Sequence, residues 1–351
     1  MSDMRLHGSN RRMADRELDS LAGAEGVAVA VVSAPACSVV IPLYNKEPHI
    51  ARAIRSVLTQ TFRDFELIVV DDGSTDGGAE AVRAIHDPRV RLVRQENAGV
   101  SAARNRGIGE SRADLVALLD ADDEWLPDFL TTIMRLQTRF PNCGAYAVAR
   151  DVVEKGGHRW TPSCRGIPAP PWEGVIPNYF RYADEYPVHV SGVAIPRRVF
   201  HTVGLFLEQA RFFEDIEMWT RIALRYPIAF SSQVLEIYHK DAENRACDRP
   251  IPLENPMTDV LASALRSGVL PAGVQRDDIA EYKNKRHIHC AGKCVHAGMP
   301  AQARTHLRAA ASTRRHRREW RYWYVRSLVP TSLLSTARKA KRFITGGNDR
   351  S

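Results

Sequence analysis

Carboxylate side chains follow two apolar segments of the sequence at the points where those segments end. They are Asp71 and Asp72 after FELIVV at 65–70, and Asp120, Asp122 and Asp123 after LVALL at 115–119. Carboxylate oxygens are hard ligands that suit Mg²⁺ or Mn²⁺. An anionic diphosphate does not bind such acids directly, because like charges repel each other. The pattern therefore predicts a site where a divalent cation lies between acidic side chains and a phosphate-bearing substrate.

Short apolar runs alternate with segments of helical periodicity through the first half of the chain. The expected strands are 38–41, 65–70, 90–93 and 115–119, and the expected helices are 50–58, 78–85 and 101–110. This alternation predicts βαβ units and an α/β fold with a mostly parallel sheet covered by helices on both faces. Ligands of such sheets bind beyond the carboxyl ends of the strands, which is where the acidic residues fall.

The acidic segments also have structural explanations that compete with a ligand site. Asp123 or Glu124 could cap a helix that begins near Trp125, and Thr75 or Asp76 could cap the helix expected at 78–85. The glycine motifs GxGxxG and GxxxxGK[ST] are absent from the sequence, so phosphate binding by a glycine loop lacks support. Two acidic strand ends in one predicted sheet favour the cation site over simple capping.

Four motifs occur in an order that resembles family 2 glycosyltransferases. They are SVVIPLYN at 38–45, DDGSTD at 71–76, NAGVSAARN at 97–105 and DADD at 120–123. The resemblance covers about 37–244. It implies a GT-A fold, an inverting reaction, a nucleotide-diphosphate sugar as donor and a divalent cation, Mn²⁺ or Mg²⁺. We expect a UDP-linked sugar, although the motifs do not identify it.

The resemblance also implies roles on the nucleotide side of the site. Tyr44 resembles the aromatic residue that stacks on the base of the donor, and Asp72 resembles the carboxylate that accepts a hydrogen bond from the pyrimidine N–H. Arg104 resembles a basic residue that faces the donor, with an exposed helix arginine as the alternative. The other residues expected at the nucleotide sugar are Pro42, Asn45, Asp71, Asp120 and Ala121.

In the DxD element at 120–123, the resemblance makes Asp122 the likeliest direct metal ligand, with Asp120 beside it and Asp123 assisting. Many relatives carry a further histidine in a Tyr-Arg-x-His-x-x-Asn segment. Here the segment reads YHKDAEN at 238–244. The third ligand therefore stays open between His239, Asp241 and water.

A Glu-Asp pair at 214–215, within FEDIEMWTR, resembles the pair that carries the general base in relatives. Inverting transfer requires the acceptor hydroxyl to lose its proton as it attacks. We expect Asp215 to be this base, with the charge of Glu214 raising its pKa. The alternative is that both acids only favour a helix N-terminus electrostatically. The segment 188–195 resembles a strand beside the acceptor pocket, where His189 or Ser191 could face the sugar.

Beyond about 250 the sequence predicts helices, at 278–297, 300–311 and 319–328. A cluster of histidines and cysteines occurs in the first of them: His287, His289, Cys290, Cys294 and His296. No second CxxC or HxxxH pair accompanies it, so thiols packed between helices are favoured over a zinc site. We therefore divide the chain into a flexible leader (1–36), a catalytic domain (37–249) and a helical, basic C-terminal extension (250–351).

Basic charge is concentrated at the end of the chain, where 301–351 holds 13 Lys or Arg and 2 Asp or Glu. Aromatic residues interleave with these basic residues at 304–342, which favours contact with an anionic membrane surface over a solvated helix face. Nucleic acid is not expected as a partner, because no recognition motif accompanies the segment.

The 351 residues, 44% hydrophobic and 26% charged, exclude disordered and collagen-like classes. No apolar run approaches the ~18–20 residues of a membrane span, and the six cysteines suggest reduced thiols. We expect a cytoplasmic enzyme, held peripherally at the inner face of the plasma membrane, that acts on a glycan or lipid-linked acceptor. A nucleotidyltransferase on a similar scaffold, or a non-catalytic membrane- or nucleic-acid-binding protein, is the alternative.

Overall fold

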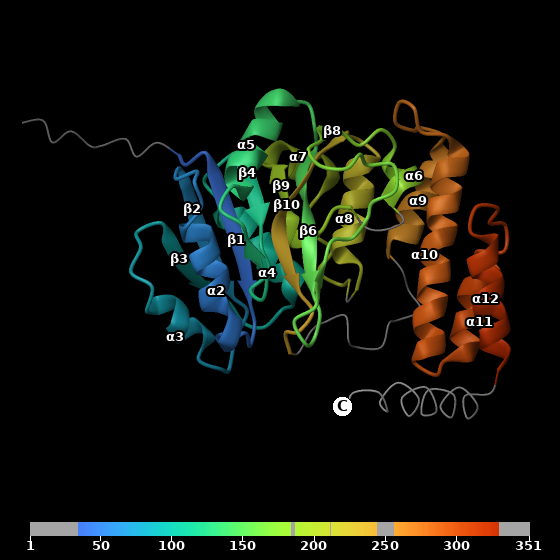
Figure 1. The fold of residues 1–351 in the computed structure, drawn as a ribbon, viewed down its shortest axis with the longest axis horizontal. Helices are drawn as coiled ribbons and strands as arrows, with labels where there is room; N and C mark the ends of the chain where they lie inside the picture. Colours follow the sequence, from blue (N-terminus) through green and yellow to red (C-terminus); the bar gives the residue numbers. More distant parts are fainter. Residues whose placement is uncertain (1–33, 184–186, 211, 244–255, 330–351) are drawn as a thin grey trace, which may run out of the picture. The chain divides into compact units, whose positions relative to one another are not determined.

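The structure is a computed structural model that describes residues 34–183, 187–210, 212–243 and 256–329. These residues form one mixed sheet of ten strands in the order β3-β2-β1-β4-β9-β6-β10-β5, with β7 beside β6 and β8 beside β10 (Figure 1). The strands are β1 (Cys37–Leu43), β2 (Phe65–Asp71), β3 (Val90–Arg94), β4 (Leu115–Leu118), β5 (Glu124–Trp125), β6 (Ala145–Val153), β7 (Arg159–Trp160), β8 (Glu173–Val175), β9 (Val193–Pro196) and β10 (Ile228–His239). The expected α/β fold is confirmed.

The directions of the strands determine at which edge of the sheet the candidate site lies. β3, β2, β1 and β4 run parallel to one another, as do β6 and β10, whereas β9 is antiparallel between β4 and β6. The chain therefore leaves β1, β2 and β4 at the same edge of the sheet. The segments that follow these three strands contain Tyr44, Asp72 and the DxD element, so the predicted convergence of polar residues is present.

The helices of the described residues cover both faces of the sheet and build the C-terminal extension. They are α2 (Glu47–Leu58), α3 (Gly78–Arg83), α4 (Val100–Glu110), α5 (Phe129–Arg139), α6 (Tyr179–Tyr182), α7 (Arg197–Val203), α8 (Glu214–Ala223), α9 (Pro256–Ser267), α10 (Arg276–His296), α11 (Pro300–Ala309) and α12 (Arg317–Leu328). The segment that resembled a strand at 188–195 is a strand only in its second half, because Val190–Gly192 forms a 3-10 turn.

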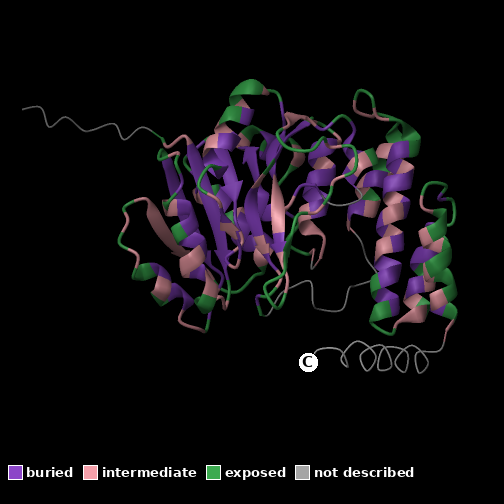
Figure 2. Ribbon diagram, in the orientation of Figure 1, coloured by how far each residue is buried: buried purple, intermediate pink, exposed green. Residues whose placement is uncertain are grey.

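Alternating side chains of β1 pack into two hydrophobic cores, one on each face of the sheet. Val39 and Ile41 join the core that contains buried residues of α2 and α5, whereas Val40 joins the core that contains those of α8. All seven residues of β1 are buried (Figure 2). Trp219 and Ile222 of α8 are also fully buried, so their side chains pack inward.

Helix α4 lies close to β1 because Gly107 has no side chain there. A Cβ atom at Gly107 would lie 2.3 Å from Val40 Cγ1, whereas one at Gly109 of the same helix would meet no atom within 4 Å. We expect Gly107→Ala to lower the free energy of unfolding by about 1–3 kcal/mol through overpacking. Gly109→Ala is the matched control and should stabilise by about 0.5–1 kcal/mol, since alanine favours helix. Urea denaturation measures both; equal effects would contradict the close packing.

The C-terminal extension packs as a group of helices in which α10 contacts α6, α9 and α11. Asn178 Nδ2 donates a hydrogen bond to Asp278 Oδ2 at 2.9 Å, which joins α10 to the segment before α6. Cys290 and Cys294 are buried. Among the described residues, the histidines and cysteines of 287–296 do not form a group of three metal-ligand atoms. No helix in the described part of the chain is long and apolar enough to span a bilayer.

Some of the sequence-based expectations concern residues outside those described. Almost all of the expected leader (1–36), the expected boundary at 249/250 and the basic stretch 338–342 belong to this category. The division into leader, catalytic domain and extension therefore stays a prediction.

Candidate active site

The loop after β1 is joined by hydrogen bonds to the turn after β2. Asn45 has a left-handed backbone (φ 50°). Its N–H donates to Ser74 Oγ at 3.1 Å, and its Oδ1 accepts from Thr75 N at 2.8 Å. The preceding Tyr44 is 44% exposed, so its ring is accessible to a ligand. Pro42, by contrast, lies inside β1 and is buried.

Asp72 is buried and accepts four hydrogen bonds from its own chain. Its Oδ1 accepts from Gln95 Nε2 and Ala98 N, and its Oδ2 accepts from Asn97 Nδ2 and Gly99 N, at 2.8–3.2 Å. Each oxygen thus has two donors, so the carboxylate fixes the 95–99 segment before α4. The predicted contact of Asp72 with a base would share one of these oxygens with a backbone or amide donor. That contact stays a prediction.

Asp71 also holds the turn after β2. Its Oδ1 accepts from Ser74 N at 2.9 Å, and its Oδ2 lies 3.2 Å from Arg94 Nε. Asp76 Oδ1 accepts from Gly78 N, the first residue of α3, but the N-cap residue is Gly77, so neither Thr75 nor Asp76 is the expected cap.

The first and third residues of the DxD element each pair with a cationic side chain. Asp120 Oδ1 lies 2.8 Å from Arg104 Nη2, and Asp122 Oδ2 lies 2.7 Å from Lys46 Nζ. Both carboxylates are partly exposed, at 28% and 17%. Ala121 between them is buried in the core. The strand end therefore presents two carboxylates in positions that already accommodate positive charge.

Arg104 connects the DxD element with the start of α8. The guanidinium is buried and donates from Nη1 to Glu214 Oε1 at 3.0 Å, in addition to its bond with Asp120. The two carboxylates are thus held by a single side chain, although 94 residues separate them in the sequence. The alternative of an exposed helix arginine is wrong.

Helix α8 begins with the Glu-Asp pair directly after Phe213, whose backbone is left-handed (φ 62°). Burial, followed by the nearby charge of Asp215, raises the pKa of Glu214, and Arg104 opposes this rise. The structure therefore assigns a raised pKa to Glu214, the neighbour of the expected base. Asp215 is half-buried and its Oδ1 accepts from Ile216 N at 2.7 Å.

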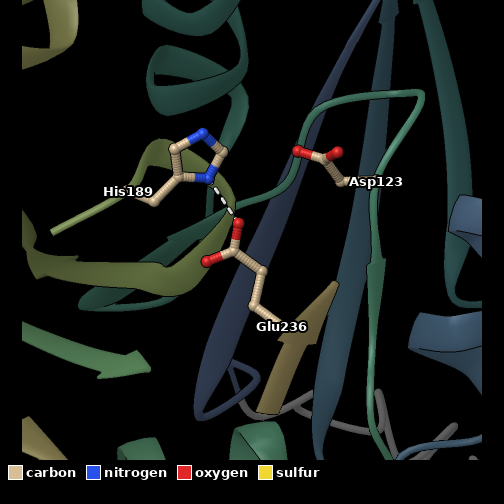
Figure 3. A group of neighbouring side chains, drawn as sticks. All are labelled: Asp123, His189 and Glu236. Carbon is tan, nitrogen blue, oxygen red and sulfur yellow. Dashed lines mark hydrogen bonds and ion pairs between the residues drawn. The ribbon is translucent and has the colours of Figure 1, made fainter. Parts of the chain in front are cut away.

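Asp123 has different partners from Asp120 and Asp122. One of its oxygens accepts from His239 N at 3.0 Å and the other from Ser191 Oγ. It is buried beside His189 and Glu236, as Figure 3 shows. Burial raises the pKa of Asp123 well above its ordinary value. Neither Asp123 nor Glu124 caps the next helix, because α5 begins only at Phe129, so that alternative is wrong.

The segment 239–243 lies beside the DxD element. His239 bridges two acids, with Nδ1 3.1 Å from Asp241 Oδ1 and Nε2 3.1 Å from Glu124 Oε1. Lys46 Nζ, which pairs with Asp122, also donates to the carbonyl of Glu243 at 2.7 Å. His239 and Asp241 thus both remain candidates for the third ligand.

Sequence reasoning missed three residues of this region. Lys46 and Arg52 contact the side chain and the carbonyl of Asp122, and Glu236 pairs with His189. Lys46 directly follows the SVVIPLYN motif, and this position could have identified it as a residue of the site. Glu236 lies in β10, where nothing in the local pattern distinguishes it.

Parts of the sequence, and the fold, are similar to those of known glycosyltransferases. Residues 38–202 match the model of glycosyl transferase family 2. A succinoglycan biosynthesis protein, ExoW of Rhizobium meliloti, is 42% identical over 109 residues, which are 29% of this chain and 34% of that protein. The chain spans about a third of the length of the curated relatives it matches.

Two solved structures are similar in fold. S. aureus TarS in complex with UDP-GlcNAc has a TM-score of 0.59 at 16% identity, covering 78% of this chain and 81% of that one. The mannosyltransferase PcManGT from Pyrobaculum calidifontis, in complex with GDP-Man and Mn²⁺, has a TM-score of 0.54 at 20% identity, with coverages of 89% and 81%. Residues 38–202 of the chain therefore match glycosyltransferase family 2, and the fold is similar to that of solved GT-A glycosyltransferases.

Proposed function

We propose that this chain transfers a sugar, with inversion, from a nucleotide-diphosphate sugar to a hydroxyl group of an envelope polysaccharide or glycoconjugate. The observation that carries the proposal is the bridge of Arg104 between Asp120 and Glu214. It brings the element expected to bind the donor to the element expected to activate the acceptor. The similarity to ExoW, a succinoglycan biosynthesis protein, supports a polysaccharide product.

On the donor side, Asp122 would hold a divalent cation, with Asp120 beside it and His239 or Asp241 as further ligand. The ligand atoms of this cation site would be mainly carboxylate oxygens, which suit Mn²⁺ or Mg²⁺. The ion pair of Asp122 with the ammonium group of Lys46, at 2.7 Å, supports binding of positive charge at this carboxylate. A cation bound there neutralises charge on the departing diphosphate. Lys46 would then be available to the same phosphates.

On the acceptor side, Asp215 would remove the proton of the attacking hydroxyl. A carboxylate acts as general base when it is ionised and within hydrogen-bond reach of that proton. Glu214 is engaged by Arg104, so Asp215 is the acid of the pair left to face the acceptor. The buried Arg104 fixes Glu214 and, through it, the first turn of α8.

The nucleotide would lie over the loops after β1 and β2. The exposed ring of Tyr44 would stack on the base, and Asn45 and Asp71 shape the turn beneath it. Asp72 would accept a hydrogen bond from the base, as its position in the motif predicts. A UDP-linked sugar is the first choice; TarS is in complex with UDP-GlcNAc and PcManGT with GDP-Man.

A thermal-shift screen tests the donor. The full chain is heated with UDP-, GDP-, CDP- and dTDP-sugars, with and without Mn²⁺. We expect one nucleotide class to raise the melting temperature, and to do so more strongly with Mn²⁺. Stabilisation by none of the four classes would contradict a nucleotide-sugar enzyme.

We further propose that α12 holds the protein at an anionic membrane surface. Residues spaced by three or four positions form its exposed face: Arg318, Arg321, Tyr322, Val325 and Leu328. Tyr322, Val325 and Leu328 are 52–61% exposed. The tryptophans, which the sequence placed at headgroup level, pack inward, because Trp320 Nε1 donates to Leu307 O and Trp323 adjoins Gly292. Exposed apolar groups beside arginines favour binding to anionic lipid.

Replacing Tyr322, Val325 and Leu328 together by serine should weaken binding to phosphatidylglycerol-containing vesicles by about tenfold or more, since apolar area is no longer buried in lipid. Co-sedimentation at low salt measures the binding, and wild-type binding should fall at high salt. Val269→Ser is the control, because Val269 is 78% exposed but lies outside α12, between α9 and α10. Equal binding of the triple variant and the control would remove the membrane proposal.

A further inference from the structure

Asp123, His189 and Glu236 form a compact group of ligand-type side chains under the DxD element. They come from three separate parts of the chain: the segment after β4, the segment before β9, and β10 (Figure 3). One ligand atom from each lies within 4.8 Å of the other two. Among the residues that the structure describes, these are the three that meet this condition. Asp123 and Glu236 are fully or almost fully buried.

The hydrogen bonds inside the group leave one carboxylate oxygen without a partner. Glu236 Oε1 pairs with His189 Nδ1, whereas Glu236 Oε2 is buried and makes no hydrogen bond. A buried, unpaired carboxylate oxygen carries a desolvation cost that native proteins usually avoid. A proton or a cation bound by the Glu236 carboxylate would offset its buried negative charge.

The backbone of the turn before β9 packs closely against the Glu236 carboxylate. A Cβ atom at Gly192 would lie 2.1 Å from Glu236 Oε2. Glycine at this position therefore permits Glu236 to approach the 3-10 turn and His189. The carboxylate is held in place from two sides, by the turn and by the imidazole.

The ionisable groups of this cluster are two carboxylates and one imidazole. Burial lowers the pKa of His189, but the adjacent Glu236 raises it more, so the net direction is upward, with Arg150 opposing. The group therefore holds two buried carboxylates beside a single imidazole.

We propose that Asp123, His189 and Glu236 bind a second divalent cation, separate from the cation expected at Asp122. Imidazole nitrogen together with carboxylate oxygen suits Zn²⁺ or Mn²⁺. His189 would bind through Nδ1 in its neutral form, so a proton leaves the group when the ion enters. The ion joins the DxD segment to β10 and to the turn before β9. Its role is to hold Asp120, whose N–H donates to Ser191 Oγ, a partner of Asp123.

The proposed second cation site does not depend on glycosyl transfer. Its test therefore measures the metal content of the protein. The Asp122→Ala variant removes the expected donor cation and serves as the background. After equilibration with Zn²⁺ or Mn²⁺ and gel filtration, we expect about one ion per chain by mass spectrometry. Adding Glu236→Gln or His189→Gln to this background should abolish that ion. His287→Gln is the matched control, because His287 pairs with His306 in the extension, and should retain it.

A second measurement covers variants that fail to fold. EDTA should lower the melting temperature of the Asp122→Ala background, and added Zn²⁺ or Mn²⁺ should restore it. Absence of a bound ion in this background, together with an unchanged melting temperature, would overturn the proposal. The group would then be a protonated hydrogen-bond cluster. An ion that persists in both double variants, or that is lost with His287→Gln, would overturn it as well.

Discussion

Asp215→Asn is expected to lower kcat by about 10²- to 10⁴-fold, the usual contribution of a general base. Asparagine keeps the shape of the side chain but cannot accept a proton at neutral pH. Donor binding should be unchanged, because Asp215 faces the acceptor in our proposal and Arg104 contacts Glu214 instead. Release of the nucleoside diphosphate measures turnover, and the thermal shift with the donor measures binding.

Glu217→Gln is the matched control for this variant. Glu217 lies in the same first turn of α8, but its carboxylate is buried and pairs with Arg221 at 2.7 Å. We expect Glu217→Gln to lower stability and to leave kcat within a few-fold of the wild type. If Asp215→Asn lost donor binding while turnover persisted, the assignment of the base would be wrong.

Asp122→Ala is expected to abolish the effect of Mn²⁺ on donor binding and to reduce kcat/KM by about 10³-fold or more. A metal ion on a leaving diphosphate contributes several kcal/mol to the transition state, and about 1.4 kcal/mol corresponds to a factor of ten. The loss also leaves Lys46 without its carboxylate partner. Initial rates over a range of Mn²⁺ concentrations measure the effect.

Asp128→Ala controls for a general loss of acidic charge in the same segment. Asp128 is exposed and accepts a hydrogen bond from Thr61 Oγ1, whereas Asp122 pairs with Lys46. Its replacement should leave both the Mn²⁺ dependence and kcat unchanged. Full activity of Asp122→Ala at any Mn²⁺ concentration would contradict the assignment of Asp122 as a metal ligand.

Hydrophobic periodicity was sufficient to predict the strands and helices that form the donor half of the domain. β1, β2 and β4 are completely buried runs, and α2 carries its apolar residues at helical spacing, so each element agrees with its local pattern. Because three of these strands are parallel, the meeting of Tyr44, Asp72 and Asp122 at one edge followed from topology. The family motifs then suggested which of the acids has which role.

The partners of the acidic side chains could not be predicted in this way. Asp122 and Asp123 are consecutive residues, and consecutive side chains of a chain that is not helical point in different directions. Asp122 therefore pairs with Lys46, whereas Asp123 joins Ser191 and His189 from the other half of the domain. The sequence contains no signal for a contact between positions so far apart.

In the C-terminal extension, the sequence of α12 likewise could not predict which of its side chains are buried. Arginines and aromatic residues alternate in α12, and the pattern indicates an amphipathic surface without identifying which aromatic residues are exposed. Packing against α11 and α10 decides this, because Trp320 and Trp323 fill that interface and leave Tyr322 outside. A tertiary contact thus determined the face that local periodicity left undecided.

The most direct test of the account is a crystal structure with the nucleoside diphosphate and Mn²⁺, using the anomalous signal of the metal. We expect a manganese peak bonded to Asp122 and to a phosphate oxygen, with the base against Tyr44 and the sugar side opening toward Asp215. A nucleotide bound elsewhere on the chain, with no manganese at Asp122, would contradict the proposed enzyme.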